Sequence, residues 1–252
     1  MKYLLYMKRN APINPKIQGV TENESGDFLL VDKPVDWTSF DVVAKIRNTY
    51  TVAGLRRKVG HCGTLDPRAS GLLILATGKK TKQIAGLEVL DKVYEGVIKL
   101  GVKTESHDAE TPEFGQCGVN HLTVAEIKAA AAALEGKHMQ QPPMHSAAWH
   151  KGKRLYELAR KGKNVEERKA REICVNSFEV TAVDLPFVHF RMDVSKGAYI
   201  RVLAYDFGQN LGVGGYLYSL RRVSIGEYNV SDAKSITDTI EVIMREAKDS
   251  AK

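Results

Sequence analysis

Residues 60–67 read GHCGTLDP, and the apolar run LLILA follows at residues 72–76. The glycines permit a tight loop, and Pro67 moves Asp66 away from helical geometry. A short, fully apolar run is typical of a buried strand, so we predict a strand at residues 72–76. A carboxylate on a loop beside a buried strand is held rigidly, as a nucleophile or general base requires. The alternative is an ordinary Asp-Pro turn whose carboxylate bonds its own backbone.

The segments on either side of this loop show strand and helix patterns without a strict βαβ order. Thr38 with Asp41, and Thr123 with Glu126, have the spacing of a capping box, which marks the start of a helix. We predict strands at residues 28–32, 72–76, 92–100, about 173–183 and 187–194, and helices at residues 38–50, 123–136, 199–211 and about 236–247. This order predicts an α+β fold with a largely antiparallel sheet. Residues 1–25 lack a sustained period and are predicted to form an arm.

The composition is that of a soluble globular protein: the chain has 252 residues, of which 43% are hydrophobic and 27% charged. Its three cysteines are an odd number at wide spacing, which argues against a disulfide framework or a zinc knuckle. The apolar run at residues 3–7 is too short to span a membrane or to act as a signal sequence. We therefore expect a cytoplasmic protein that does not associate with membranes.

Positive charge exceeds negative charge by 7 and is concentrated in one segment. Residues 151–171 contain nine basic and three acidic side chains. Such a density suits contacts with phosphate groups, which supply affinity without sequence preference. A solvated basic helix face is the alternative.

Two further residues have reactive potential. Arg201 follows the glycine-containing loop SKGA at residues 195–198, where it could neutralise a carboxylate or form only a surface ion pair. Tyr94 begins a strand, where its ring could stack on a base or belong to the core. The sequence has no GxxxxGK[ST], GxGxxG, HExxH or GxSxG motif, so nucleotide hydrolysis, dinucleotide redox chemistry and zinc hydrolysis lack their usual signatures.

Taken together and in order, these segments resemble the TruB family of tRNA pseudouridine synthases. The resemblance covers about residues 26–230, and no single segment would be specific alone. The matching segments are DFLLVDKP at 27–34, GHCGTLDP at 60–67 with Gly71, KVY at 92–94, QPPMHSA at 141–147, SKGAYIR at 195–201 and LRR at 220–222.

The resemblance implies that a uridine in RNA is isomerised to pseudouridine without a cofactor or metal. The family's usual target is uridine 55 in the T-loop of tRNA. Asp66 would be the catalytic aspartate and would attack either the base ring or the anomeric carbon of the sugar. Tyr94 would stack on the target base, and Arg201 would pair with Asp66 and keep it ionised. His61 would enter the RNA fold and occupy the space that the flipped uridine leaves.

Other residues would bind the RNA. Lys33, Lys82 and Leu220 fall at positions that line or border the family's pocket. A thumb-like insertion at about residues 140–171, with Lys151, Lys153 and Arg154, would close over the T-arm stem-loop of tRNA.

The resemblance also implies a domain organisation. Residues 26–230 would form one catalytic domain on a mixed, mainly antiparallel sheet flanked by helices. Residues 231–252 would form one helix and no separate RNA-binding domain. The lack of such a domain argues against dependence on a guide RNA. The resemblance to the family also leads us to expect a monomer.

Two departures from the family pattern affect local packing: His145 stands where many members have tyrosine, and Cys62 where small β-branched residues are usual. Two functional alternatives remain. The same chemistry could act on ribosomal or other RNA, or the scaffold could serve a non-catalytic RNA-binding protein or tRNA folding chaperone. Asp66, Tyr94 and Arg201 argue against the second, because a carboxylate facing RNA is electrostatically unfavourable for pure binding.

Overall fold

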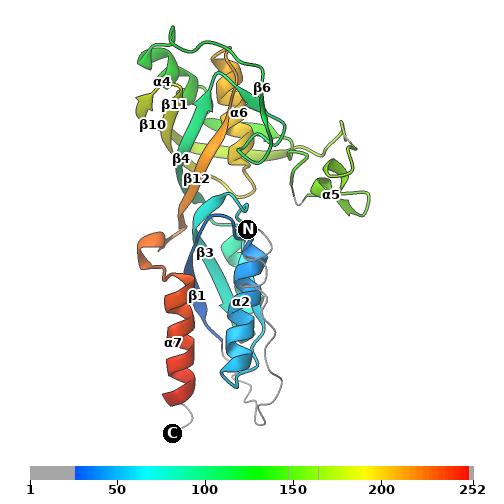
Figure 1. The fold of residues 1–252 in the computed structure, drawn as a ribbon, viewed down its shortest axis with the longest axis vertical. Helices are drawn as coiled ribbons and strands as arrows, with labels where there is room; N and C mark the ends of the chain where they lie inside the picture. The colour runs from blue at the N-terminus through cyan, green and yellow to red at the C-terminus, as the bar shows by residue number, and fades with distance from the viewer. Residues whose placement is uncertain (1–25, 147, 164, 250–252) are drawn as a thin grey trace. The chain divides into compact units, whose positions relative to one another are not determined.

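The computed structural model describes residues 26–249, apart from 147 and 164, and these fall into two compact units (Figure 1). The first unit combines residues 26–90 with residues 222–249, and the second contains residues 91–221. One boundary falls between Leu90 and Asp91, and the other lies within strand β12 (Gly215–Ile225). The predicted arm at residues 1–25 lies outside the described residues.

The first unit is a small antiparallel sheet with helices. Strand β3 pairs with β1 along one edge and with β2 along the other, and the strand order places β12 on the edge opposite to β1. Strand β12 also pairs with β13. Besides residues 222–225 of β12, its elements are β1 (Phe28–Lys33), α2 (Ser39–Val52), β2 (Val59–Cys62), β3 (Ala69–Thr77), η1 (Gly78–Gln83), α3 (Ile84–Glu88), β13 (Tyr228–Asn229), η2 (Val230–Asp232) and α7 (Ile236–Asp249).

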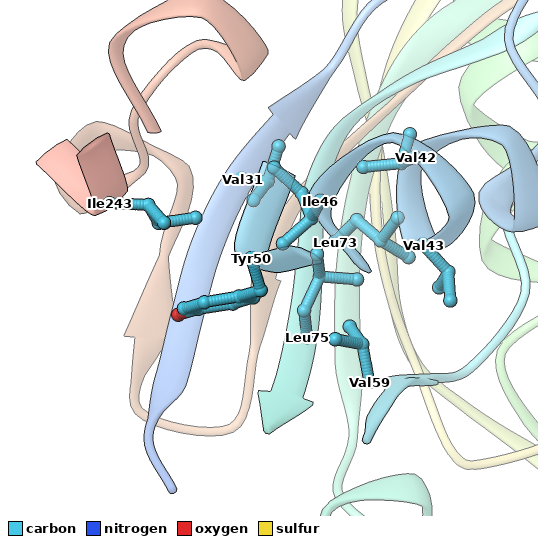
Figure 2. Packing of buried hydrophobic residues seen from close by; sticks show 9 residues of the cluster. All are labelled: Val31, Val42, Val43, Ile46, Tyr50, Val59, Leu73, Leu75 and Ile243. Carbon is cyan, nitrogen blue, oxygen red and sulfur yellow. The ribbon is translucent and has the colours of Figure 1, made fainter. Parts of the chain in front are cut away.

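Strand β3 is buried on both faces, which explains why its sequence is continuously apolar rather than alternating. Side chains from one face meet helices α2 and α7 in a single cluster (Figure 2). This cluster contains Val31, Val42, Val43, Ile46, Tyr50, Val59, Leu73, Leu75 and Ile243. On the other face, Leu72 and Ile74 pack with Cys62 and Ile225. Each buried aliphatic side chain contributes about 1.5–3 kcal/mol, so the two clusters fix β3 firmly.

Helix α2 begins where the capping-box spacing predicts. The Thr38 hydroxyl accepts a hydrogen bond from the Asp41 amide at 3.0 Å, and the Asp41 carboxylate accepts one from the Thr38 amide at 2.9 Å. The predicted end at Tyr50 is two residues short of the observed end at Val52. The predicted last helix is confirmed by α7, which packs against α2 through Ile243.

The second unit contains an antiparallel sheet in the order β4-β11-β10-β7, with β12 beside β4. Helices α4 and α6 contribute to its core, in which Phe207 of α6 packs against Phe178 of β10. Besides residues 215–221 of β12, its elements are β4 (Lys92–Leu100), β5 (Lys103–Thr104), β6 (Glu113–Phe114), α4 (Val124–Ala132), β7 (Gly136–Gln140), β8 (Trp149–His150), β9 (Lys153–Arg154), α5 (Leu155–Ala159), β10 (Arg171–Asp184), β11 (Phe187–Val194) and α6 (Ile200–Asn210).

The strands predicted at residues 92–100 and 187–194 are confirmed with the same bounds by β4 and β11. The helix predicted to continue to Gly136 instead ends at Ala132. Its final turn tightens, because the amides of Leu134 and Glu135 each bond the carbonyl three residues earlier. Gly136, with φ of 94°, then opens strand β7, which the sequence pattern did not predict.

Candidate active site

Asp66 lies half-buried on the loop that joins β2 to β3 in the first unit. The preceding Leu65 is buried, and its amide and carbonyl both bond the Ser39 hydroxyl, at 2.8 and 3.1 Å. The Asp66 carbonyl accepts a hydrogen bond from the Ala69 amide at 3.0 Å, which closes the turn. The Pro67 carbonyl accepts another from the Asp36 amide at 2.7 Å. The loop is thus bonded to neighbouring elements on both sides of the aspartate.

The buried side chain of Arg222 connects this loop to strand β3. Its side chain is almost fully buried, and it donates to the Leu72 carbonyl at 2.8 Å and to the Gly63 carbonyl at 3.2 Å. Gly71 has a φ of 103°, and a Cβ there would lie 2.3 Å from the Arg222 carbonyl oxygen. Only glycine permits this approach. Arg222 belongs to the matching segment LRR at 220–222, but its contact with the loop was not predicted from the sequence.

Lys33 places a buried positive charge close to the same loop. The residue is fully buried at the end of β1, and its ammonium donates to the carbonyls of Pro34 and Trp37 at 2.9 and 2.7 Å. Burial lowers the pKa of Lys33 to about 8, while the charge of Asp66 opposes this shift and that of Arg222 adds to it. The structure therefore brings together Lys33 and Asp66, which were both predicted as site residues.

Two other predicted RNA-binding residues also lie in the first unit. His61 is on β2, opposite Leu75 of β3, and is half-buried. Burial, assisted by the positive charge of Arg222, lowers the pKa of His61, which favours a neutral imidazole. Lys82 is exposed on η1.

In the second unit, Tyr94 and Arg201 are both buried. Tyr94 lies on β4, opposite Met192 of β11. Arg201 lies in the first turn of α6, and its guanidinium donates to the carbonyls of Ser106 and His145 at 3.2 and 3.0 Å. The predicted pairing of Arg201 with Asp66 joins residues of different units and stays a prediction.

Asp108 forms an ion pair with Arg201 that the sequence analysis missed. The Arg201 Nε atom is 3.5 Å from the Asp108 carboxylate, and both side chains are more than nine-tenths buried. The other Asp108 oxygen accepts hydrogen bonds from the Ser106 hydroxyl at 2.6 Å and the Glu110 amide at 2.9 Å. The polar segment TESHDAET at residues 104–111 was the available signal, since such a density of short polar side chains indicates a bonded turn.

A cavity of about 570 Å³ lies beside this network, within the second unit. Its lining includes His107, whose ring stacks on that of Tyr205 with centroids 4.2 Å apart. Burial lowers the pKa of His107 to about 4, and the positive charge of Arg201 is the second largest cause of this shift. The imidazole is therefore neutral at physiological pH.

The remaining predicted RNA-binding residues also belong to the second unit. Leu220 is half-buried on β12. Lys151, Lys153 and Arg154 lie on the hairpin of β8 and β9, which precedes the short helix α5. The predicted basic segment is thus a hairpin followed by a helix.

Within residues 26–249, apart from 147 and 164, no three His, Cys, Asp or Glu side chains gather as metal ligands. No helix in the described part of the chain is long and apolar enough to cross a membrane.

Solved structures define the class of protein to which this fold belongs. An archaeal box H/ACA sRNP Nop10-Cbf5 complex matches 90% of this chain with a TM-score of 0.65 and 25% identity. An H/ACA RNP bound to a substrate RNA containing 2'-deoxyuridine matches 88% with a TM-score of 0.64 and 25% identity. The chain spans 56% and 55% of the chains that it matches in these structures. The fold is the pseudouridine synthase fold, and the predicted α+β class is confirmed.

Sequence comparison specifies the family. The TruB family pseudouridylate synthase (N terminal domain) matches residues 50–200. The tRNA pseudouridine synthase B of Chlorobium chlorochromatii is 64% identical over 90% of this chain and 89% of its own length. The protein of the same name from Flavobacterium johnsoniae is 42% identical over 84% of this chain and 93% of its own length. The chain belongs to the TruB family, which confirms the resemblance found in the sequence.

Proposed function

We propose that this chain converts uridine 55 in the T-loop of tRNA to pseudouridine and that Asp66 carries out the chemistry. Pseudouridine formation in tRNA is the activity of the family to which the chain belongs. The observation that carries the assignment to Asp66 is the immobilised loop between β2 and β3. The carboxylate of Asp66 lies near the buried charge of Lys33, Arg222 bonds the same loop at the Gly63 carbonyl, and the backbone on both sides of Asp66 is hydrogen-bonded.

The reaction is an isomerisation, so nothing is added to or removed from the nucleotide overall. The N1–C1′ glycosidic bond breaks, the uracil turns, and a C5–C1′ bond forms while the proton on C5 is released and N1 gains a proton. An ionised Asp66 can start this sequence by attacking either the base ring or C1′. A rigid carboxylate is required in both cases, because effective attack depends on a fixed approach to the reacting atom.

The other site residues would bring the uridine to Asp66. The target base must leave its stack at a cost of a few kcal/mol, which contacts with the protein must offset. We assign the stacking contact with the target base to Tyr94. His61 would fill the space that the flipped uridine leaves in the RNA, and its neutral imidazole is less costly to insert among bases than a cation. Arg201, held by Asp108, is assigned to Asp66 as its charge partner.

The substrate in this proposal is the T-arm stem-loop, which the hairpin and the exposed Lys82 bind through its phosphates. The chain acts as a monomer in the cytoplasm and does not use a guide RNA. The basic side chains Lys151, Lys153 and Arg154 supply sequence-independent affinity, while the fold of the T-loop supplies selectivity.

The test is release of tritium from C5-tritiated uridine in an unmodified T-arm stem-loop by the wild type and by Asp66→Asn. We expect release by the wild type and a rate at least about 10³-fold lower for the variant, because an amide cannot act as the nucleophile. RNA affinity should change by less than about tenfold. Sequencing of the product then locates the modified uridine.

Other outcomes would overturn the proposal. Release at a uridine other than position 55 would contradict the target. Equal release by the wild type and Asp66→Asn would contradict the catalytic assignment. Tight binding without release, from the stem-loop and from full-length tRNA, would favour a tRNA folding chaperone.

A further inference from the structure

The hairpin of β8 and β9 displays a tryptophan at the surface of the second unit. Trp149 pairs with Arg154 and His150 with Lys153, so the connecting turn consists of Lys151 and Gly152. Both turn residues have positive φ, 45° and 79°, as a two-residue type I′ turn requires. This turn fixes the register of the hairpin and therefore which side chains share a face.

Side chains alternate between the two faces of this hairpin. One face carries Lys153 and continues to Leu155, which is buried and whose amide bonds the Ala148 carbonyl at 2.9 Å. The buried leucine anchors that face to the protein. The other face carries Trp149 and Arg154 and therefore points away. Figure 1 shows α5, which follows the hairpin, standing away from the sheet of the second unit.

Trp149 and Arg154 form a stacked pair. The guanidinium carbon of Arg154 lies 4.0 Å from the centre of the tryptophan ring, in cation–π geometry. Trp149 is nevertheless 64% exposed, so the arginine covers only part of the indole and much of its surface meets solvent. A tryptophan with this exposure gains little from burial, but its contact with Arg154 restricts the ring to one orientation.

The charge around the indole favours nucleic acid as its ligand. Residues 149–156 contain one histidine, two lysines and one arginine but no acidic residue. Lys151 in the turn and Lys153 on β9 are exposed on the same hairpin. An aromatic face surrounded by cations is the combination by which proteins hold unpaired bases, since the ring stacks on the base while the cations contact the adjoining phosphates.

We propose that Trp149, oriented by Arg154, is a stacking platform for an unpaired base of the RNA substrate other than the target uridine. This proposal rests on the proposed function, because it takes the T-loop as the source of the unpaired base. The platform positions the RNA and takes no part in the isomerisation.

The test is to titrate the protein with the unmodified T-arm stem-loop while tryptophan fluorescence is recorded. An independent assay measures the binding affinity. The chain has only two tryptophans, Trp37 and Trp149. Stacking on a base should quench Trp149, so quenching should persist in Trp37→Phe and disappear in Trp149→Phe. We expect Trp149→Ala to weaken binding about tenfold or more and Trp149→Phe, which keeps a ring, by less than about threefold.

Phe114→Ala is the matched control, because Phe114 is an exposed aromatic of the same unit that is 51% exposed. Its removal should leave affinity within about twofold. A blunt duplex of the stem sequence, which has no unpaired base, should not quench Trp149.

Equal affinity of Trp149→Ala and the wild type for the stem-loop, with the circular dichroism of both unchanged, would overturn the platform. Quenching by the blunt duplex would overturn it as well, because the ring would then respond to RNA that offers no unpaired base. Tritium release by the wild type separates the two proposals. Release together with unaltered binding by Trp149→Ala contradicts the platform alone, whereas no release and no binding by the wild type contradicts the proposed function.

Discussion

The loop that carries Asp66 and the hairpin of β8 and β9 are both short, glycine-containing segments that precede a regular element, yet they are held in place in opposite ways. In the loop at residues 63–68, backbone groups bond side chains from distant parts of the sequence, such as Ser39 and Arg222. In the hairpin at residues 149–154, Trp149 instead pairs and stacks with Arg154, five residues away, and most of its surface faces solvent.

This difference follows from the two tasks assigned to the segments. A carboxylate that attacks a carbon atom must be fixed to within a fraction of an ångström, and buried polar contacts provide that rigidity. A surface that binds phosphates and unpaired bases must instead keep its charges and rings accessible. We therefore expect substitutions in the loop to affect stability and those in the hairpin to affect RNA affinity.

The comparison is tested most strongly by a pair of glycine substitutions. Gly71 and Gly152 both have positive φ, 103° and 79°, but a Cβ at Gly71 would lie 2.3 Å from a backbone oxygen, and one at Gly152 meets nothing within 4 Å. Gly71→Ala should lower the free energy of unfolding by about 3–5 kcal/mol, from overlap and backbone strain together. Gly152→Ala should cost only the strain of the turn, about 1–2 kcal/mol.

Urea denaturation of the two variants beside the wild type measures this difference. Similar losses for both glycines would show that backbone strain alone governs them. The close packing of Arg222 under the loop would then have no energetic importance.

The second test uses the buried charge of Lys33. Its pKa falls from 10.5 to about 8 in the folded protein, so between these pH values the unfolded chain binds the proton and the folded chain does not. Stability contributed by this residue must therefore rise with pH across that interval. Relative to Lys33→Met, the wild type should gain on the order of 3 kcal/mol in the free energy of unfolding between pH 7.5 and pH 10.5.

Denaturation of both proteins at several pH values within that range gives the measurement. The difference between the two proteins isolates Lys33, since all other titrating groups are common to both. A constant difference would mean that the ammonium is well solvated, and a difference that falls with rising pH would mean that the charge of Asp66 outweighs the effect of burial.

The sequence predicted those features whose causes are local. The capping box at Thr38 and the alternation of residues 92–100 and 187–194 each lie within one element, and all three were found. The loop with Asp66 was also recognisable, because glycine and Asp-Pro restrict the backbone wherever they occur.

Features that depend on distant partners could not be predicted. Arg222 bonds a carbonyl 150 positions earlier, and arginine is rarely fully buried, so nothing near it in the sequence indicated its role. Asp108 meets Arg201 only after the fold brings the turn that follows β5 next to the first turn of α6. Strand β12 was missed because Ser219, Arg221 and Arg222 interrupt the apolar pattern near its centre.

The smallest expected effect concerns the lysines of the hairpin and sharpens the distinction between charge and stacking. Lys151→Gln and Lys153→Gln should each weaken binding of the stem-loop by about fivefold at 0.1 M salt and lower the slope of log K against log salt by up to about 0.9. Trp149→Ala should weaken binding without changing that slope, because stacking releases no counterions. Lys128 is an exposed lysine on α4 of the same unit, so Lys128→Gln is the matched control for the loss of one charge. If all three lysine variants reduced the slope equally, net charge rather than the position of the hairpin would determine RNA binding, and the contrast between the two segments would lose its functional meaning.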